Sequence, residues 1–128
     1  MLILVVDDEP QIRKLLSTGL SGYGHDVVTA ADGATAITLV AQRRPDLLVL
    51  DVNLGREPDG LEVCRRLREW SRVPIIILSV RGDEATKVAA LDAGADDYLT
   101  KPFGMEEWRA RIQAVSRRSV GEPGGAAE

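Results

Sequence analysis

The chain has 128 residues, of which 45% are hydrophobic and 28% charged, with a formal net charge of −4 and a single cysteine, Cys64. This length fits one domain with a core of its own, and one cysteine excludes both an intrachain disulfide and a cysteine metal cluster. The acidic balance disfavours direct binding to nucleic acid, and because the sequence has neither a membrane-length apolar run nor a signal-peptide pattern, we expect a cytoplasmic protein with no membrane partner.

The first part of the chain predicts two strands, each followed by a helix. Residues 2–6 form a continuous apolar run, as in a strand buried on both faces, and residues 26–30 are β-branched, as in an edge strand. Pro10 suits the first turn of the helix that follows the first strand. The apolar stripes expected on the two helices are Ile12, Leu15, Leu16 and Leu20, and then Ala36, Ile37, Val40 and Ala41.

The rest of the chain continues the alternation with three more pairs of strand and helix. Residues 47–50 and 75–78 are apolar runs that predict buried strands, and residues 97–100 predict a fifth strand from their place in the alternation. The helical stripes that follow these strands are Leu61, Cys64 and Leu67, then Ala85, Val88 and Ala89, and finally Trp108, Ile112 and Val115.

Five repeats of strand and helix indicate an α/β fold. The connections should be right-handed crossovers, which place helices on both faces of a parallel sheet. We expect this domain to span residues 1–118. Residues 119–128 lack periodicity and are rich in glycine, so we expect them to form a flexible linker or tail.

Polar side chains come directly after four of the predicted strands. They are Asp7 and Asp8 after the first strand, Asp51 after the third, Ser79 after the fourth and Lys101 after the fifth. Ligands of open parallel sheets bind beyond the carboxyl ends of the strands, so we expect these side chains to converge. Three crowded carboxylates repel one another and favour Mg²⁺, which prefers hard oxygen ligands and bridges carboxylates to phosphate. A carboxylate also forms aspartyl-phosphates as a nucleophile, with an ammonium and a hydroxyl stabilising the phosphoryl oxygens.

Four motifs of the chain resemble those of the receiver domain of two-component response regulators. They are VVDDEP at 5–10, LVLD at 48–51, IIILS at 75–79 and LDAGADDYLTKPF at 91–103. The resemblance extends over residues 2–118, and its last motif is most similar to the winged-helix (OmpR/PhoB-type) subfamily, particularly regulators of potassium-transport operons. The resemblance implies a flavodoxin-like, five-stranded parallel sheet in the order 2-1-3-4-5.

The resemblance also implies a metal site and a phosphorylation site. Asp51 would be the phosphoacceptor, phosphorylated by a sensor histidine kinase with Mg²⁺ as the cofactor. Asp8, Asp51 and the backbone carbonyl of Asn53 would ligate the Mg²⁺, and Asp7 would act through water.

The remaining roles that the resemblance implies concern the response to the phosphoryl group. Ser79 and Lys101 would hold the phosphoryl oxygens, and the Tyr98 ring would turn inward when Ser79 is drawn toward the phosphate. The Lys101-Pro102 pair matches the cis peptide of the family, which is tolerable because the second residue is proline.

The implied function is a signalling switch rather than an enzyme. Phosphorylation would control dimerisation, and transcription would be controlled through an output domain that this chain does not contain. Some charged residues match positions that pair across a two-fold interface in the winged-helix subfamily, formed by the fourth helix, the fifth strand and the fifth helix. They are Lys87, Asp96, Asp97, Glu107, Arg111 and Arg118. An ordinary solvated face is the alternative interpretation of these charges.

The chain departs from the family pattern at two places beside the predicted site. Gly55 occupies the position where the family has proline, and one residue is added before Gly60. Glycine loosens a loop relative to proline, so we expect altered metal affinity or phosphoryl lifetime, because this loop borders Asn53. Val80 is larger than the small residue that normally follows the hydroxyl residue, and we expect it to slow phosphorylation by bulky donors.

Two other functions fit parts of the sequence. A phosphohydrolase of the haloacid dehalogenase type also uses an aspartyl-phosphate, but it has Asp-x-Asp after its first strand, where this chain has Asp7-Asp8-Glu9. A degenerate receiver that serves only as an interaction module would lack an acid, the lysine or the hydroxyl. Taken singly, the acids could also be helix caps and Lys101 a solvent-exposed residue.

Overall fold

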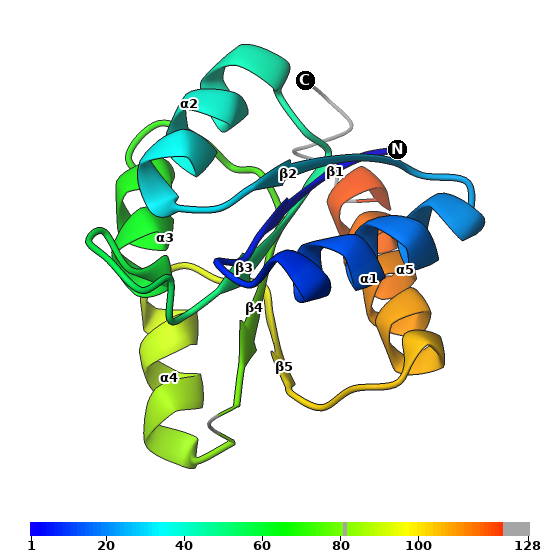
Figure 1. Cartoon of the computed structure of the whole chain (residues 1–128). Helices are drawn as coiled ribbons and strands as arrows, with labels where there is room; N and C mark the ends of the chain where they lie inside the picture. The colour runs from blue at the N-terminus through cyan, green and yellow to red at the C-terminus, as the bar shows by residue number, and fades with distance from the viewer. Residues whose placement is uncertain (81, 122–128) are drawn as a thin grey trace.

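The computed structural model of the chain describes residues 1–80 and 82–121, and the side chains of residues 118–121 lie outside this description. Within this part of the chain, five strands alternate with five helices (Figure 1). The elements are β1 (Leu2–Val6), α1 (Pro10–Gly22), β2 (Asp26–Ala30), α2 (Gly33–Arg43), β3 (Leu47–Asp51), α3 (Gly60–Arg68), β4 (Ile75–Ser79), α4 (Glu84–Asp92), β5 (Asp97–Thr100) and α5 (Met105–Gly121).

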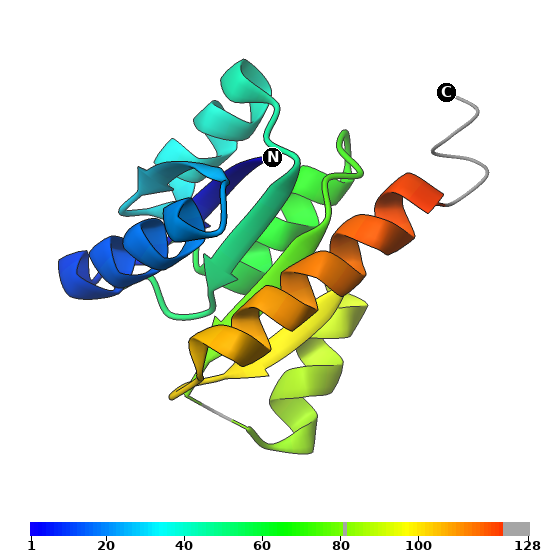
Figure 2. The same ribbon diagram turned by 90° about the vertical axis from the view of Figure 1, so that its right-hand side faces the viewer.

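The strands form one parallel sheet in the order β2-β1-β3-β4-β5, which confirms the predicted flavodoxin-like fold and the predicted edge position of β2. Helices α1 and α5 cover one face of the sheet, and α2, α3 and α4 cover the other (Figures 1 and 2). No helix in the described residues is both long and apolar enough to cross a membrane.

The central strands supply side chains to two separate cores. Leu4 and Val6 of β1 pack into the core under α2 and α3, whereas Ile3 and Val5 pack into the core under α1 and α5. All four side chains are almost completely buried. Successive side chains of a strand point to opposite faces, so a strand covered on both faces must be apolar at every position. This requirement explains the continuous apolar runs that predicted β1, β3 and β4.

Strands β3 and β4 are each one residue longer than the sequence predicted. Asp51 is the last residue of β3, and Ser79 is the last residue of β4. In the ladder, Asp51 lies opposite Leu78, and Ser79 lies opposite Thr100 of β5. The backbone of both polar residues is therefore fixed by the sheet rather than by a loop.

The helical stripes predicted from the sequence are correct on α5 and partly wrong on α1, α2 and α4. On α1, Leu16 and Leu20 are fully buried, but Leu15 is 51% exposed because it lies about 100° around the helix from Leu16. On α2, Ala36 and Val40 are buried as predicted, whereas Ala41 is exposed.

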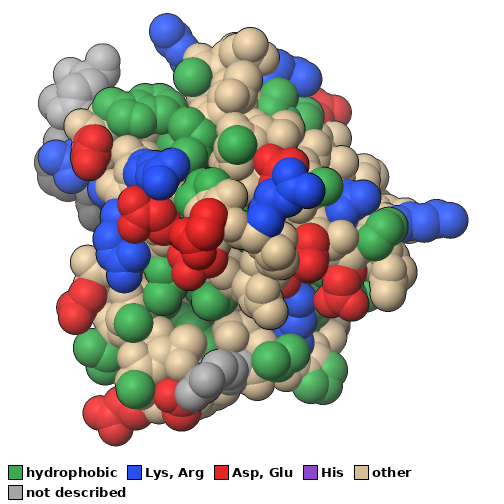
Figure 3. All heavy atoms as spheres, turned by 60° about the vertical axis from the view of Figure 1, so that its left-hand side comes forward, with side chains coloured by type: hydrophobic (Ala, Val, Ile, Leu, Met, Phe, Trp, Pro, Cys, Tyr) green, Lys and Arg blue, Asp and Glu red, His purple; other side chains and the backbone are tan. Residues whose placement is uncertain are grey.

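Helix α4 turns a different face to the sheet from the one predicted. Its buried residue is Ala90, whereas Ala85 is exposed and Val88 is 47% exposed. Leu91 is 52% exposed as well. The residue that α4 buries is thus a small alanine, and its larger apolar side chains lie on the surface. Figure 3 views the molecule from the side of α3 and α4, where hydrophobic side chains lie among acidic and basic ones.

Helix α5 extends beyond the predicted end of the domain. The buried side chains of Trp108, Ile112 and Val115 confirm its predicted stripe. The helix continues through Gly121, so residues 119–121 of the predicted linker are helical. Residues 122–128 of that linker lie outside the described part of the chain.

Gly60, at the start of α3, sets the distance between this helix and the end of β3. Its amide donates a hydrogen bond of 2.8 Å to the carbonyl oxygen of Val52. A Cβ atom at this position would overlap the carbonyl oxygen of Asp51 and would lie 2.8 Å from the Cα atom of Val52. Only glycine allows this approach of backbone to backbone.

We therefore expect Gly60→Ala to lower the free energy of unfolding by about 3 kcal/mol, because backbone atoms must move to relieve the overlap. Urea denaturation followed by circular dichroism measures this change. Gly22→Ala is the matched control: a Cβ atom there meets nothing within 4 Å. The control should leave the stability unchanged or raise it by up to about 1 kcal/mol. Equal stabilities of the two variants would contradict the predicted contact.

Candidate functional site

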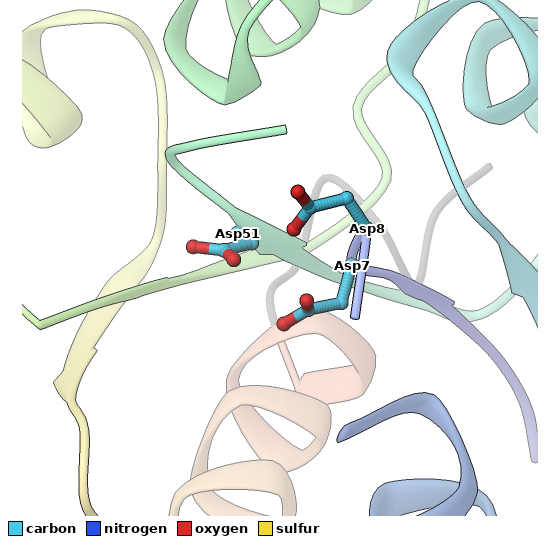
Figure 4. Close-up of side chains that lie close together, drawn as sticks. All are labelled: Asp7, Asp8 and Asp51. Atoms are coloured by element: carbon cyan, nitrogen blue, oxygen red, sulfur yellow. The ribbon is translucent and has the colours of Figure 1, made fainter. Parts of the chain in front are cut away.

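Three carboxylates meet at the carboxyl edge of the sheet (Figure 4). Asp7 and Asp8 directly follow β1, and Asp51 ends the neighbouring strand β3. One carboxylate oxygen from each of the three lies within 4.8 Å of the others. Asp7 and Asp51 are buried, whereas Asp8 is exposed. The three acids thus converge as the sequence predicted from the order of the elements, and the structure adds that two of them are buried and one reaches solvent.

Lys101 supplies the positive charge that faces this cluster. Its Nζ atom lies 3.1 Å from an Oδ2 atom of Asp7, 3.1 Å from Oδ2 of Asp51 and 4.0 Å from Oε1 of Glu9. The Lys101 amide donates a hydrogen bond of 2.8 Å to the carbonyl oxygen of Ser79, which ties the end of β5 to the end of β4. The Lys101-Pro102 peptide is cis, which confirms the prediction.

Burial and the neighbouring charges both shift the pKa values of Asp51 and Lys101. Burial of Asp51 and the nearby charge of Asp7 raise the pKa of Asp51 to about 6, although the hydrogen bond from Lys101 lowers it. Burial disfavours the charged form of Lys101, but the hydrogen bonds and charges of Asp51 and Asp7 outweigh this effect and raise the pKa of Lys101. One ammonium therefore does not fully compensate three carboxylates, and a further positive charge would stabilise the ionised site.

The donor set of the site fits a hard divalent cation. The carboxylates of Asp7, Asp8 and Asp51 provide oxygen atoms only, the ligand type that Mg²⁺ prefers. A cavity of about 330 Å³ opens beside them and leaves room for the waters that Mg²⁺ retains. Asn53, whose backbone carbonyl the resemblance implies as a third ligand, lines the same cavity.

The cavity also contains the hydroxyl and the lysine that the sequence singled out. Its lining residues are Asp8, Glu9, Asp51, Val52, Asn53, Ser79, Val80 and Lys101. Ser79 is 4% exposed, whereas Val80 is 75% exposed at the same cavity. The position of Val80 fits the expectation that it limits access for bulky donors, which stays a prediction.

The predicted switch residue Tyr98 lies on β5 beneath α4. Tyr98 is 8% exposed and belongs to the core that contains Ala90 of α4. The Nζ atom of Lys87 lies 5.9 Å from the ring centroid, within the range of a cation–π contact. In this structure the ring is therefore inside the protein, and its predicted movement stays a prediction.

Most of the residues predicted to pair across a dimer interface have partners within the chain. Arg111 lies 2.9 Å from a carboxylate oxygen of Asp97 and 3.6 Å from one of Glu107. Asp96 lies 3.0 Å from Arg68. The side chain of Arg118 lies outside the described part of the chain.

Asp96 has a structural role that sequence reasoning missed. Its carboxylate accepts a hydrogen bond of 2.8 Å from the amide of Ile75, the first residue of β4, in addition to its contact with Arg68. The Arg68 side chain also donates to the carbonyl oxygen of Gly94 at 2.9 Å. No local sequence signal reveals these bonds, because the partners are more than 20 residues apart in the chain.

Two further contacts hold Asp7 in place and were not predicted. The Asp7 carboxylate accepts a hydrogen bond of 2.9 Å from the amide of Glu9, and the guanidinium of Arg13 donates to the carbonyl oxygen of Asp7 at 2.8 Å. Arg13 lies on α1, one helical turn from Glu9. In the sequence, a single arginine one helical turn after Glu9 does not indicate a hydrogen bond to Asp7.

The chain is similar to known proteins over most of its length. The family model of the response regulator receiver domain matches residues 3–113. The chain is 50% identical over 119 residues to the transcriptional regulatory protein KdpE of Mycobacterium tuberculosis, covering 93% of the chain and 52% of that protein. It is 49% identical over 116 residues to the KDP operon transcriptional regulatory protein KdpE of Escherichia coli, covering 91% of the chain and 51% of that protein. The chain thus spans about half the length of the curated relatives it matches.

A solved structure shows the same fold. The chain is 31% identical to the BeF3-activated N-terminal receiver domain of Klebsiella pneumoniae RstA, with a TM-score of 0.87, 91% of this chain covered and 99% of that chain.

The raised pKa of Asp51 predicts how the metal-free protein responds to pH. Because the pKa is higher in the folded state than its ordinary value of 3.8, the folded state binds the proton more tightly. The stability that this provides is fully present below pH 3.8 and is lost as the pH rises through about 6. An ionised Asp51 then destabilises the fold by up to about 3 kcal/mol.

We expect Asp51→Asn to be more stable than the wild type in EDTA at about pH 7.5, by up to about 3 kcal/mol, and the difference to disappear at about pH 4. Urea denaturation at both pH values measures this. Asp26→Asn, which removes an exposed carboxylate from the edge strand, controls for the change in net charge. A wild type as stable as Asp51→Asn at the higher pH would show that ionised Asp51 does not destabilise the fold.

Proposed function

The chain belongs to the response regulator receiver domain family, and we propose that it is the phosphoacceptor domain of a transcriptional response regulator. The observation that carries the proposal is the meeting of Asp8, Asp51, Ser79 and Lys101 at one cavity. The similarity to two proteins named as KdpE transcriptional regulators supports a role in transcription, exerted by an output domain outside this chain. Direct DNA binding would belong to that domain.

In the proposed reaction, a carboxylate oxygen of Asp51 attacks the phosphorus atom of a phosphohistidine on a sensor histidine kinase. A phosphorus–oxygen bond forms as the phosphorus–nitrogen bond breaks, and the electron pair leaves with the imidazole, which takes up a proton. Phosphoryl transfer of this kind requires mainly position and countercharge from the protein. Asp51 suits the role because the sheet fixes its backbone and the cavity exposes one side of its carboxylate.

A magnesium ion, when bound, would supply countercharge for the carboxylates and for the phosphoryl oxygens. Asp8, Asp51 and the Asn53 backbone carbonyl would hold it, with Asp7 acting through water. In the structure, Asp7 lies in direct contact with Lys101, so it also orients the ammonium toward Asp51. Lys101 and the Ser79 hydroxyl would bind the phosphoryl oxygens from the opposite side.

The switch would be transmitted through β4 and β5 to α4. Ser79 lies opposite Thr100 in the β4–β5 ladder, and Tyr98 is on the same strand β5. A shift of Ser79 toward the phosphoryl group would change the packing of the Tyr98 ring under α4 and favour a dimerising population. The chain would then act as a cytoplasmic signalling switch, with no enzymatic turnover beyond its own phosphorylation and dephosphorylation.

We expect incubation with acetyl phosphate and Mg²⁺ to add one phosphoryl group per chain, detected by intact-mass spectrometry. Asp51→Asn, or EDTA in place of Mg²⁺, should abolish the adduct, because each removes the nucleophile or the countercharge. Asp46→Asn, which removes an acid at the opposite end of β3, is the control and should be modified like the wild type.

A second donor, phosphoramidate, distinguishes a donor mismatch from an inactive site. If neither donor modifies the wild type, the chain is an interaction module and not a phosphoacceptor. Release of inorganic phosphate over many turnovers from a small phosphate ester would instead favour the phosphohydrolase.

The proposed dimer uses α4, β5 and α5, where Val88 and Leu91 are about half exposed. Phosphorylation should release Arg111, Asp97 and Glu107 to pair across the interface. We expect the phosphorylated wild type to dimerise in light scattering, whereas phosphorylated Leu91→Asp should remain monomeric because it places a charge on the apolar surface of α4 that the proposed dimer would bury.

Leu15→Asp is the matched control, because Leu15 is 51% exposed on α1 and Leu91 is 52% exposed on α4. This variant should dimerise like the wild type. A phosphorylated wild type that stays monomeric at high protein concentration would refute the dimer.

A further inference from the structure

The loop between β3 and α3 passes close to the Asp8 carboxylate at Gly55. Gly55 has a φ of 76°, in the left-handed region that favours glycine. A Cβ atom at Gly55 would lie 3.0 Å from Oδ2 of Asp8 and 3.9 Å from its Cγ atom. The Asp8 carboxylate therefore packs against a bare Cα atom, and any side chain at position 55 would press on it.

The loop is anchored on both sides of Gly55. Leu54 is 2% exposed and belongs to the core under α2 and α3. Pro58 is buried against α2: its carbonyl oxygen lies 2.7 Å from the position of a Cβ atom on Gly33. The Gly55 amide donates a hydrogen bond of 3.1 Å to the Asn53 side chain, which links Gly55 to the backbone expected to ligate the metal.

The Asp8 side chain is less constrained than the loop that contains Gly55. It is exposed, and no hydrogen bond or ion pair to it is found in residues 1–80 and 82–117. The carboxylates of Asp7 and Asp51 repel it. A Cβ atom at position 55 would therefore be accommodated by rotation of the Asp8 carboxylate away from Asp51, and not by retreat of the loop.

We propose that Gly55 is a positioning residue of the metal site: its missing side chain leaves the space in which the Asp8 carboxylate stays beside Asp51. The proposal rests on the proposed function, because it assigns Asp8 and Asp51 to one magnesium ion. It also explains why glycine stands at position 55, where the family has proline. The loop carries an additional residue, and a glycine in the left-handed conformation lets its backbone pass close to Asp8 without displacing it.

The test compares Mg²⁺ affinities of the wild type, Gly55→Ala and Gly24→Ala by isothermal titration calorimetry. Gly24 has a φ of 91°, and a Cβ atom there meets nothing within 4 Å. Gly24→Ala thus carries similar backbone strain without the contact to Asp8. We expect the Mg²⁺ dissociation constant to rise about 10-fold in Gly55→Ala and to stay unchanged in Gly24→Ala.

Phosphorylation by acetyl phosphate provides a second readout. In Gly55→Ala the yield should fall at low Mg²⁺ and return to the wild-type yield at saturating Mg²⁺, because the nucleophile and the lysine are unaffected. If Gly55→Ala does not fold, Gly55→Asn replaces it, since asparagine adopts the left-handed conformation more readily but carries the same Cβ atom.

The outcomes separate this inference from the proposed function. A wild type that binds no Mg²⁺ and accepts no phosphoryl group overturns both. If the wild type binds Mg²⁺ and both Gly55 and Gly24 variants bind it equally well, the inference fails and the proposed function stands. An equal loss of affinity in Gly55→Ala and Gly24→Ala also overturns the inference, because strain and not the contact with Asp8 would then be the cause.

Discussion

The repulsion between three carboxylates at the edge of the sheet is the interaction on which the rest of the site depends. Asp7, Asp8 and Asp51 are held together although a single ammonium, that of Lys101, faces them. Burial of Asp51, together with the poorly screened charge of Asp7, raises the pKa of Asp51 to about 6. Because the fold holds the carboxylates close together, the binding of a cation would relieve their repulsion. The site therefore favours a ligand that brings positive charge.

The fold can hold the carboxylates together against their repulsion because they lie at the ends of rigid strands. Asp51 ends a strand that is fully buried and paired on both sides, and Gly60 brings the start of α3 against its backbone. Asp7 is fixed by bonds to the backbone of Glu9 and by Arg13. The exposed Asp8 is the least constrained of the three, so its position depends on the loop that passes over it at Gly55.

The same edge of the sheet connects the site to a surface some distance away. Ser79 ends β4, Lys101 directly follows β5, and a backbone hydrogen bond joins the two residues. Tyr98 on β5 lies beneath α4, which buries only a small alanine and leaves Val88 and Leu91 on the surface. So small a buried contact is consistent with the proposed shift of α4 on phosphorylation.

Hydrophobic periodicity, with the alternation of strands and helices, determined the fold class, the edge position of β2 and the acids, hydroxyl and lysine at the ends of the strands. These features are local, because the faces that an element must bury dictate its pattern of apolar residues. The resemblance to a family added the strand order and the cis peptide.

Only the tertiary structure decided which face α4 buries, the partners of Asp96 and Arg13, and the close approach of Gly55 to Asp8. Each of these depends on atoms far apart in the chain, and α4 in particular has too few large apolar residues for its own sequence to fix its orientation. The sequence by itself therefore determined which groups reach the edge of the sheet, whereas packing between distant segments decided how closely they stand and what holds them there.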